Sequence, residues 1–422
     1  GICPVSHHLA ASKALDAVVG ARPVPPSADK LRRLMHYGQV MQSHALHFFH
    51  LASPDLLFGF DAEPARRNIV GVAQAHPDIA KKGILLRKYG QEVIRATAGK
   101  RIHGTGSVPG GMNRLLQPED HALLSRDVQQ MIEWAEDAVA LVKRLHAADV
   151  ARHESFGLVP AKMLSLVRPG DGALELYDGV IRVRDAAGNI LLDDQDPATY
   201  LDLLEEEVKP WTYMKFPYLR SLGPTDGWYR VGPLARVQNC NFIATPRAER
   251  ERREFVDSGH GQIIHGALAT HWARMIELLH AMEVMADLLH DGDLLQGVLT
   301  ASGPRAEECI GVIEAPRGTL IHHYRVGADD LVTMCNLIVS TTHNNQAMNE
   351  SVRAVAAERF DGRDISEGLL NEIEVAIRAY DPCLSCATHA LGSMPLQVDL
   401  VDQGGALRSR LTRHGDGRFE RA

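Results

Sequence analysis

Two cysteine-containing segments at opposite ends of this 422-residue chain constrain its fold more than any other feature. The first reads Gly1-Ile2-Cys3-Pro4-Val5-Ser6-His7, and the second reads Asp381-Pro382-Cys383-Leu384-Ser385-Cys386-Ala387-Thr388-His389. The Cys-x-x-Cys pair of the second segment places two soft sulfur ligands on one turn, at a spacing that suits one metal or a bridge between two. If both segments serve one metal centre, the fold must bring the two ends of the chain together.

The first segment has a second feature in its cysteine–histidine spacing. Cys3 and His7 are four residues apart, so they share one face if the chain after Pro4 is helical. A thiolate at a helix N-terminus is stabilised by the positive end of the helix dipole. The alternative is a buried cysteine beside a surface histidine.

Composition narrows the class of protein. The chain is 45% hydrophobic, which is enough for one large core or two subdomains. A formal net charge of −8 and a pI near 6.2 argue against a nucleic-acid-binding protein. No apolar run of the sequence reaches the length needed to span a membrane.

The remaining cysteines suggest core residues rather than a disulfide framework, since six cysteines are few for a chain of this length. Cys240, Cys309 and Cys335 stand in mixed or apolar stretches, and we predict that they are buried. The chain also has no spare cysteine cluster for an iron–sulfur centre of its own.

Hydrophobic periodicity predicts an α+β fold dominated by helices. One long helix is predicted from Asp29 to Pro54, and another ends at Gly99, where glycine supplies the left-handed stop. Further helices are predicted over residues 117–148, 263–290 and 365–380. A small β-meander is predicted over residues 172–192, and three antiparallel strands over residues 309–342. In the tail, residues 396–405 suggest a hairpin.

The two terminal motifs resemble the ligand motifs of the nickel–iron hydrogenase large subunit. The resemblance implies four cysteine ligands, two from each end, with Cys383 a terminal nickel ligand and Cys3 and Cys386 bridging nickel to iron. It also implies one predominantly helical large-subunit domain over residues 1–422, with small antiparallel sheets. The fourth cysteine and the family's proton-transferring glutamate would precede Gly1, so we expect the sequence to be a fragment that lacks its N-terminal segment.

The family resemblance gives roles to the two motif histidines. In the family, the histidine at the position of His7 hydrogen-bonds a bridging sulfur, which tunes the metal without binding it. His389 matches a magnesium ligand that is also the last residue of the mature subunit. Residues 390–422 would then be an extension that a maturation endopeptidase removes after nickel is loaded.

A third motif, Glu314-Ala315-Pro316-Arg317-Gly318, resembles the segment that lies over the open metal positions of the family. The resemblance assigns a catalytic role to Arg317 and a place beside the cofactor to Pro316. It also pairs this arginine with Asp55 and Asp381. Taken without the resemblance, the arginine would be a residue of a strand-end turn, and the two aspartates would be turn or cap residues.

The segment Ser340-Thr341-Thr342-His343-Asn344 resembles the family's loop beside a cyanide ligand of iron. Thr341 matches the position whose hydroxyl donates to that cyanide. The family commonly has proline and tryptophan where this chain has Ser340 and His343.

Together these motifs predict the catalytic subunit of a cytoplasmic hydrogenase that oxidises H2 reversibly and heterolytically. The implied cofactors are a Ni-Fe(CN)2(CO) centre and Mg2+ on this chain, with iron–sulfur clusters, FMN and NAD on partner subunits. The implied partners are an iron–sulfur small subunit, diaphorase subunits and the endopeptidase, with no nucleic acid and no membrane span. The motifs look most like the soluble, NAD-reducing, bidirectional group.

Three alternatives stay open from the sequence. Deazaflavin-reducing hydrogenases share much of the same pattern. A non-catalytic protein with a structural zinc site could use the same cysteines. The hydrogenase-like subunit of respiratory complex I is a third alternative, but Cys3, Cys383 and Cys386 count against it because that homologue has lost these cysteines.

Overall fold

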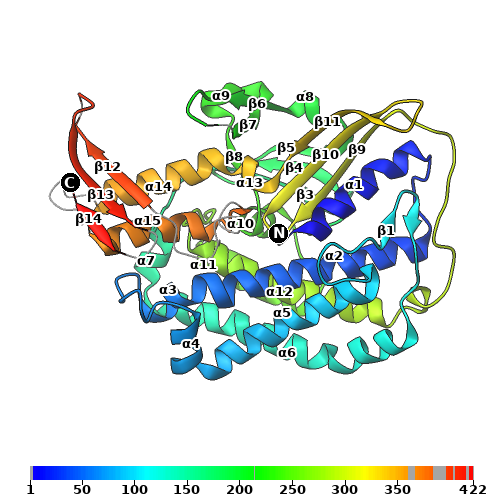
Figure 1. Ribbon diagram of the computed structural model, residues 1–422, viewed down its shortest axis with the longest axis horizontal. Helices are drawn as coiled ribbons and strands as arrows, with labels where there is room; N and C mark the ends of the chain where they lie inside the picture. The colour runs from blue at the N-terminus through cyan, green and yellow to red at the C-terminus, as the bar shows by residue number, and fades with distance from the viewer. Residues whose placement is uncertain are drawn as a thin grey trace.

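Long helices lie side by side in one layer of the molecule, and the β-sheets lie over them (Figure 1). The computed structural model describes residues 3–212, 214–359, 366–383, 396–402, 404–414 and 418–421. The long helices are α2 (Pro26–Leu46), α5 (Pro77–Ala98), α6 (Pro118–Ala148) and α12 (Ala269–Leu289).

Helices α2 and α5 approach each other closely because glycines face one another at their crossing. A Cβ on Gly90 would lie 2.7 Å from the carbonyl oxygen of Gly38, so only glycine fits there. Buried side chains of α2, including Leu31, Leu34 and Met41, complete the packing of this layer. The helix that carries so many buried residues is the one on which the metal-site segments rest.

Most of the predicted helices are confirmed. Helix α5 ends at Gly99, which has a φ of 84°, and α6 matches the predicted residues 117–148. The run predicted to reach Pro54 continues from α2 through a π-helix, His47–Ala52, into α3, Ser53–Phe58. The predicted start at Ile263 is wrong, because α12 begins only at Ala269.

The predicted antiparallel strands after Cys309 are confirmed as a three-stranded sheet in the order β11-β10-β9. Strand β9 (Glu308–Ala315) and strand β10 (Gly318–Val326) form a hairpin, and β11 (Val332–Ile338) pairs with the other edge of β10. The turn of the hairpin consists of Pro316 and Arg317, so the hairpin itself presents the predicted arginine.

The predicted meander is right in its later part and wrong in its first part. Strands β4 (Val180–Arg184) and β5 (Ile190–Gln195) pair as expected. Residues 172–179 do not form the predicted strand, because the Glu175 carboxylate accepts hydrogen bonds from the backbone of Tyr177 and closes a turn. Strand β4 pairs instead with β3 (Lys162–Val167), which the sequence pattern did not reveal.

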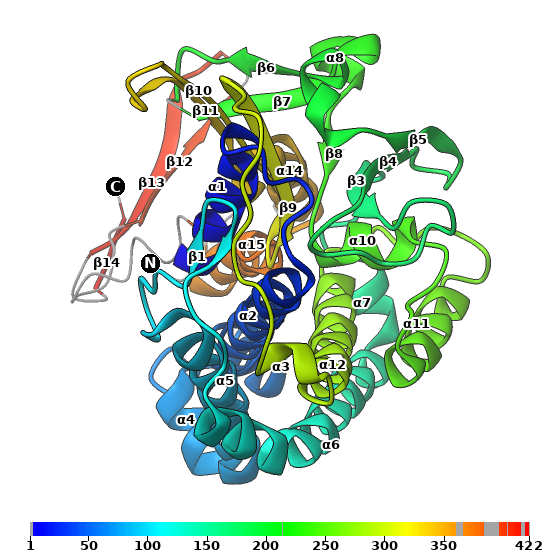
Figure 2. The same ribbon diagram turned by 90° about the vertical axis from the view of Figure 1, so that its right-hand side faces the viewer.

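The remaining strands before the tail are short. The sheet of β3 also contains β8 (Tyr229–Arg230), and two hairpins pair β1 (Ser107–Val108) with β2 (Gly111–Met112) and β6 (Leu204–Val208) with β7 (Lys215–Leu219). The other α-helices are α1 (Pro4–Val18), α4 (Ile69–Ala75), α7 (Val150–Ser155), α8 (Tyr200–Leu203), α9 (Gly223–Asp226), α10 (Pro233–Asn239), α11 (Pro246–Ser258), α13 (Ser340–His343), α14 (Asn345–Arg359) and α15 (Glu367–Ala379). Figure 2 shows the β6–β7 hairpin and α8 at the opposite end of the molecule from α4 and α6.

The predicted hairpin of the tail is confirmed. Strand β12 (Leu396–Val401) pairs with β13 (Leu407–Arg413), which also pairs with β14 (Phe419–Arg421). This tail sheet contacts α15, where Leu411 packs against Leu370 and Arg413 forms an ion pair with Glu374 at 2.7 Å. The sheet therefore lies against the helix that leads into the second cysteine motif (Figure 1).

The prediction of burial holds for Cys240 and Cys309 and is wrong for Cys335, which is exposed. Strand β11 is an edge strand with most of its residues facing solvent, so the apolar run around Cys335 is not a core segment. The fold class is α+β, as predicted. In the described part of the chain, no helix combines the length and the apolar character that a membrane span requires.

Candidate metal centre

The fold brings the two cysteine-containing segments together, as the paired motifs require. Cys3 is the N-cap residue of α1, and Cys383 follows the end of α15 after Pro382. Their sulfur atoms lie 3.9 Å apart. The start of α1, the β9–β10 turn and α13 gather around this pair near the middle of the view in Figure 1.

The spacing of the two sulfurs suits two ligands of one metal ion. Metal–sulfur bonds of about 2.3 Å at a tetrahedral angle place two sulfurs about 3.8 Å apart. Neither Cys3 nor Cys383 is in a disulfide. The other predicted ligands, Cys386 and His389, lie outside the described residues. Within the described ranges, no group of three or more His, Cys, Asp or Glu side chains is arranged to hold a metal.

The guanidinium of Arg317 contacts the sulfur pair directly. Its Nη1 donates to Cys3 Sγ at 2.8 Å and to Ser43 Oγ at 3.4 Å, and only 3% of the residue is exposed. Its Nε and Nη2 donate to the backbone oxygen and Oδ1 of Asp381, at 2.6 and 3.0 Å. The arginine thus fixes the N-terminal cysteine and the approach to the C-terminal motif at the same time.

The two thiols are coupled electrostatically. A hydrogen bond from Cys3 lowers the pKa of Cys383 to about 6, and the nearby charge of Arg317 also lowers that pKa, against the opposing effect of burial. The same hydrogen bond, together with burial, raises the pKa of Cys3. The pair therefore loses its first proton readily and its second with difficulty. It then consists of one thiolate and one thiol that share the remaining proton.

Asp381 has the predicted place beside Arg317, in a strained and buried position. Its φ is 55°, in the left-handed region that few residues other than glycine adopt, and 3% of it is exposed. Burial raises the pKa of its carboxyl, and the charge of Arg317 opposes that rise. Its Oδ2 is buried and has no hydrogen-bond partner among the described residues.

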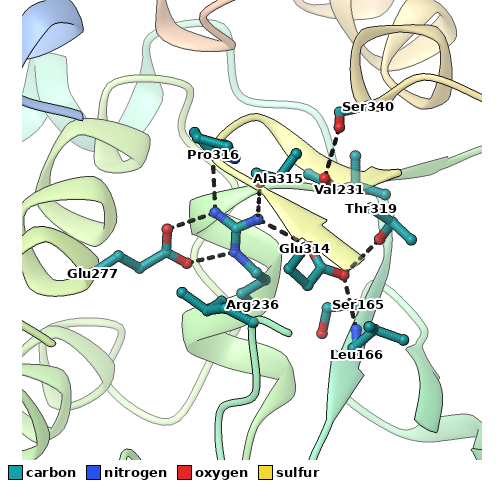
Figure 3. A network of polar contacts seen from close by, with 12 residues as sticks. Ser165, Leu166, Val231, Arg236, Glu277, Glu314, Ala315, Pro316, Thr319 and Ser340 are labelled. Atoms are coloured by element: carbon teal, nitrogen blue, oxygen red, sulfur yellow. Dashed lines mark hydrogen bonds and ion pairs between the residues drawn. The ribbon is translucent and has the colours of Figure 1, made fainter. Parts of the chain in front are cut away.

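The turn that carries Arg317 is held from behind by a second buried arginine, Arg236 of α10 (Figure 3). Arg236 donates to the carbonyl oxygens of Ala315 and Pro316 at 2.7 and 3.0 Å. It also forms ion pairs with Glu277 at 2.6 Å and with Glu314 at 2.9 Å, and all three side chains are fully buried. Burial raises the pKa of Glu277, but the charge of Arg236 and the hydrogen bonds from Arg236 and His44 together lower that pKa to about 2.

Ser340 anchors the other end of the same turn, because its hydroxyl donates to the carbonyl oxygen of Gly318 at 2.7 Å. Gly232 lies so close that a Cβ there would meet the carbonyl oxygen of Arg317 at 2.8 Å. The sequence analysis missed the roles of Arg236 and Ser340. The Gly232-Pro233 pair at the start of the Arg236 helix was a partial signal. A glycine there indicates that another segment of backbone packs closely, but the sequence does not show which segment.

Replacing Arg236 with methionine is expected to destabilise the subunit by about 3–5 kcal/mol, because Glu277 and Glu314 would stay buried without their counter-charge. The measurement is the free energy of unfolding of the metal-free subunit in denaturant. The exposed Arg126→Met variant is the control and should unfold at the wild-type midpoint. A loss below about 1 kcal/mol for Arg236→Met would show that the buried network does not hold the turn.

Thr341 also lies at the centre, on α13. Its Oγ1 accepts a hydrogen bond from the backbone N–H of Cys383 at 3.0 Å, and 4% of the residue is exposed. A hydroxyl that accepts in this way keeps its own hydrogen available to donate. The arrangement therefore leaves the threonine able to act as the donor that the sequence motif predicts.

His7 lies one turn after Cys3 on α1, and its backbone N–H donates to the Cys3 carbonyl oxygen at 3.3 Å. Its Nδ1 is 3.1 Å from Nε2 of His322 on β10. The predicted partner of His7 is a bridging sulfur, and of the two bridging cysteines, Cys3 and Cys386, the second belongs to the part of the chain that the structure does not describe. His322 was not predicted as a neighbour from the sequence.

Asp55 is the predicted site residue whose observed partners differ from the expected one. Its buried carboxylate contacts Arg378, lies 3.4 Å from Nε of Arg67, and accepts from Asn371 Nδ2 at 3.1 Å. Two of these partners belong to α15. The carboxylate therefore links α3 to α15. The resemblance implied a pairing of Asp55 with Arg317, whereas these contacts are with Arg378, Arg67 and Asn371.

Comparison with known proteins identifies the family. A model of the nickel-dependent hydrogenase family matches residues 1–68 and 186–389. The NAD-reducing hydrogenase HoxS subunit beta of Cupriavidus necator is 47% identical over 425 aligned positions, which cover 96% of this chain and 86% of that protein. One subunit of the F420-non-reducing hydrogenase of Methanothermobacter thermautotrophicus is 40% identical over 420 positions, covering 97% and 87%.

A solved structure agrees with this assignment. The crystal structure of an NAD+-reducing nickel–iron hydrogenase in the H2-reduced state matches with a TM-score of 0.90 and 56% identity, covering 92% of this chain and 86% of that one. The chain therefore belongs to the nickel-dependent hydrogenase family. Within the family it is a catalytic large subunit, as the terminal motifs predicted.

Proposed function

We propose that this subunit passes electrons from H2 to NAD+ and that Cys3, Cys383 and Cys386 hold its nickel–iron centre. The observation that carries the proposal is the contact of the Arg317 guanidinium with Cys3, 3.9 Å from a cysteine at the other end of the chain. Soft thiolates suit nickel and iron, and a guanidinium cannot be deprotonated at working pH.

Each residue around the sulfur pair has a separate task in this proposal. The bound nickel–iron centre would supply the site at which H2 is split heterolytically. Arg317 fixes a positive charge at 2.8 Å from Cys3 Sγ, where it needs no rearrangement during the reaction. Cys383 Sγ holds the departing proton as the terminal sulfur. The Thr341 hydroxyl would donate to ligands of the bound iron. Arg317, Thr341 and Asp381 are each 3–4% exposed, so this side of the centre would be shielded from water.

The proposed partners follow from the need to remove electrons. The relative in Cupriavidus necator is by name a subunit of an NAD-reducing hydrogenase. We propose the same arrangement here, with an iron–sulfur small subunit as the first acceptor and a diaphorase module that carries FMN and NAD. His389 would bind Mg2+ behind the centre, and the complex would work in the cytoplasm.

The acceptor is tested with the purified complex, supplied with H2 and either NAD+ or a deazaflavin. We expect reduction of NAD+ and none of the deazaflavin above background. Reduction of the deazaflavin alone would overturn the NAD+ assignment and favour the deazaflavin-reducing group.

The tail after His389 is expected to be absent from the active subunit. We propose that residues 1–389 form one large-subunit domain and that residues 390–422 are removed on maturation. The tail sheet lies against α15, the helix before the second cysteine motif, through Leu411 on Leu370 and the ion pair of Arg413 with Glu374. Mass spectrometry of the subunit from active complex should find His389 as its last residue. An active, nickel-loaded subunit that retains Ala422 would contradict this prediction.

A further inference from the structure

Strand β10 presents two consecutive histidines to opposite sides of its sheet, and each has its own tyrosine partner. On one side, His322 lies between His7 and Tyr324: its Nε2 is 3.1 Å from His7 Nδ1, and its Nδ1 is 2.6 Å from the Tyr324 hydroxyl. On the other side, His323 Nδ1 is 3.0 Å from the Tyr200 hydroxyl. Through His7, the first of these two chains of hydrogen bonds reaches α1, whose N-cap residue is Cys3.

The chemistry of the end groups favours one direction for this chain. A phenol hydroxyl can donate, and a neutral imidazole has one nitrogen that accepts. We therefore assign the 2.6 Å contact to the Tyr324 hydroxyl as donor and Nδ1 of His322 as acceptor. A neutral imidazole that accepts at Nδ1 carries its hydrogen on Nε2. The Nε2 of His322 then donates across 3.1 Å to Nδ1 of His7.

We propose that Tyr324 and His322 are positioning residues that fix the tautomer of His7, so that His7 carries its hydrogen on Nε2. The chain is Tyr324 O–H to His322 Nδ1, then His322 Nε2–H to His7 Nδ1. With its Nδ1 accepting, a neutral His7 has its single donor at the far side of the ring. The opposite direction would leave a bare lone pair there, which repels a thiolate instead of donating to it.

Burial supports the neutral forms on which this direction depends. It brings the pKa of His322 to about 3 and raises that of Tyr324 to about 12. The inner histidine, His322, is 3% exposed, and Tyr324 is partly exposed at the outer end of the chain. The tyrosine therefore keeps its proton, and His322 does not gain a second one near neutral pH.

The inference deepens the proposed function, since the far nitrogen of His7 is useful only beside the sulfur ligands of a metal centre. His7 is linked to Cys3 through one helical turn, at 3.3 Å between its N–H and the Cys3 carbonyl oxygen. A donor at Nε2 can hydrogen-bond a metal-bound sulfur and withdraw electron density from it. Tyr324, on the central strand of this sheet, would then set the electronics of the centre through two imidazoles.

The test reads the tautomers directly, in the full-length subunit prepared without metals and labelled with 15N-histidine. Two-bond 1H–15N spectra separate a ring nitrogen that bears hydrogen from one that bears a lone pair. The His7 and His322 signals are assigned by their loss in His7→Gln and His322→Gln. In the wild type, both histidines should carry hydrogen on Nε2. If either histidine of the wild type carried its hydrogen on Nδ1, that result alone would overturn the proposal.

The variant arm uses Tyr324→Phe, which removes one hydroxyl, and Tyr200→Phe as the matched control on the other side of the strand. Tyr324→Phe should lose the single-tautomer signal of His7 and add a form with hydrogen on Nδ1. Tyr200→Phe should alter only His323. Unchanged His7 and His322 tautomers in Tyr324→Phe would overturn the proposal. Because the readout needs no metal, a complex that fails to oxidise H2 would count against the proposed function alone.

Discussion

Replacing Cys383 with serine is expected to abolish hydrogen-dependent activity of the complete complex. A serine hydroxyl is a hard, poorly ionised group, whereas the Cys383 thiol has a pKa lowered to about 6 and a sulfur 3.9 Å from that of Cys3. Nickel bound per subunit should fall with the activity, because one sulfur ligand is lost from each centre. The measurements are H2 oxidation and nickel content of the purified complex, and Cys386→Ser is expected to behave in the same way.

The control is Cys335→Ser, which changes the same chemical group on the exposed edge strand β11. It should keep both the activity and the nickel of the wild type. If Cys383→Ser and Cys386→Ser both retained substantial H2 oxidation, these cysteines would not be the metal ligands.

Replacing Arg317 with lysine should lower H2 oxidation by at least about 100-fold while the nickel content stays full. The guanidinium reaches Cys3, Ser43 and Asp381 at once through three nitrogens, and an ammonium on a flexible stem cannot make the same set of contacts. Lysine also loses its proton more readily when buried, so the fixed positive charge beside the sulfurs would be weakened.

The matched control is Arg325→Lys, eight positions further along the same hairpin. Arg325 is exposed and pairs with Glu308, so its replacement should leave turnover unchanged. Near-normal turnover of Arg317→Lys with full nickel would reduce Arg317 to a residue of the strand-end turn. Loss of nickel in parallel with activity would instead give the arginine a role in assembling the centre.

The sequence predicted elements best where one local signal decides the structure. Gly99 ends α5 because a left-handed residue is needed there, and Pro382 separates α15 from the cysteine motif. It failed where a tertiary contact overrides the pattern. Residues 172–179 alternate like a strand, yet the Glu175 side chain closes them into a turn. Strand β11 reads as apolar, but its place at the sheet edge leaves Cys335 exposed.

The site was predictable to the extent that its residues stand in recognisable motifs. Cys3, Arg317, Asp381, Thr341 and Cys383 meet, as the motifs implied. Arg236 and His322 were missed, because each acts through a partner distant in sequence and neither stands in a motif with a chemical meaning of its own. Asp55 stands in a matching motif, but the nearby guanidinium groups of Arg67 and Arg378 hold its carboxylate.

The most direct test of the central claim is an infrared spectrum of the complete, active complex. The claim is that cysteines from both ends of this chain hold a nickel–iron centre whose iron carries cyanide and carbon monoxide. These ligands absorb in a region where protein groups do not, so their bands report the centre itself. We expect one carbon monoxide band and two cyanide bands, all lost in Cys383→Ser. A folded, metal-containing complex without these bands, or with zinc as its only metal, would contradict the account.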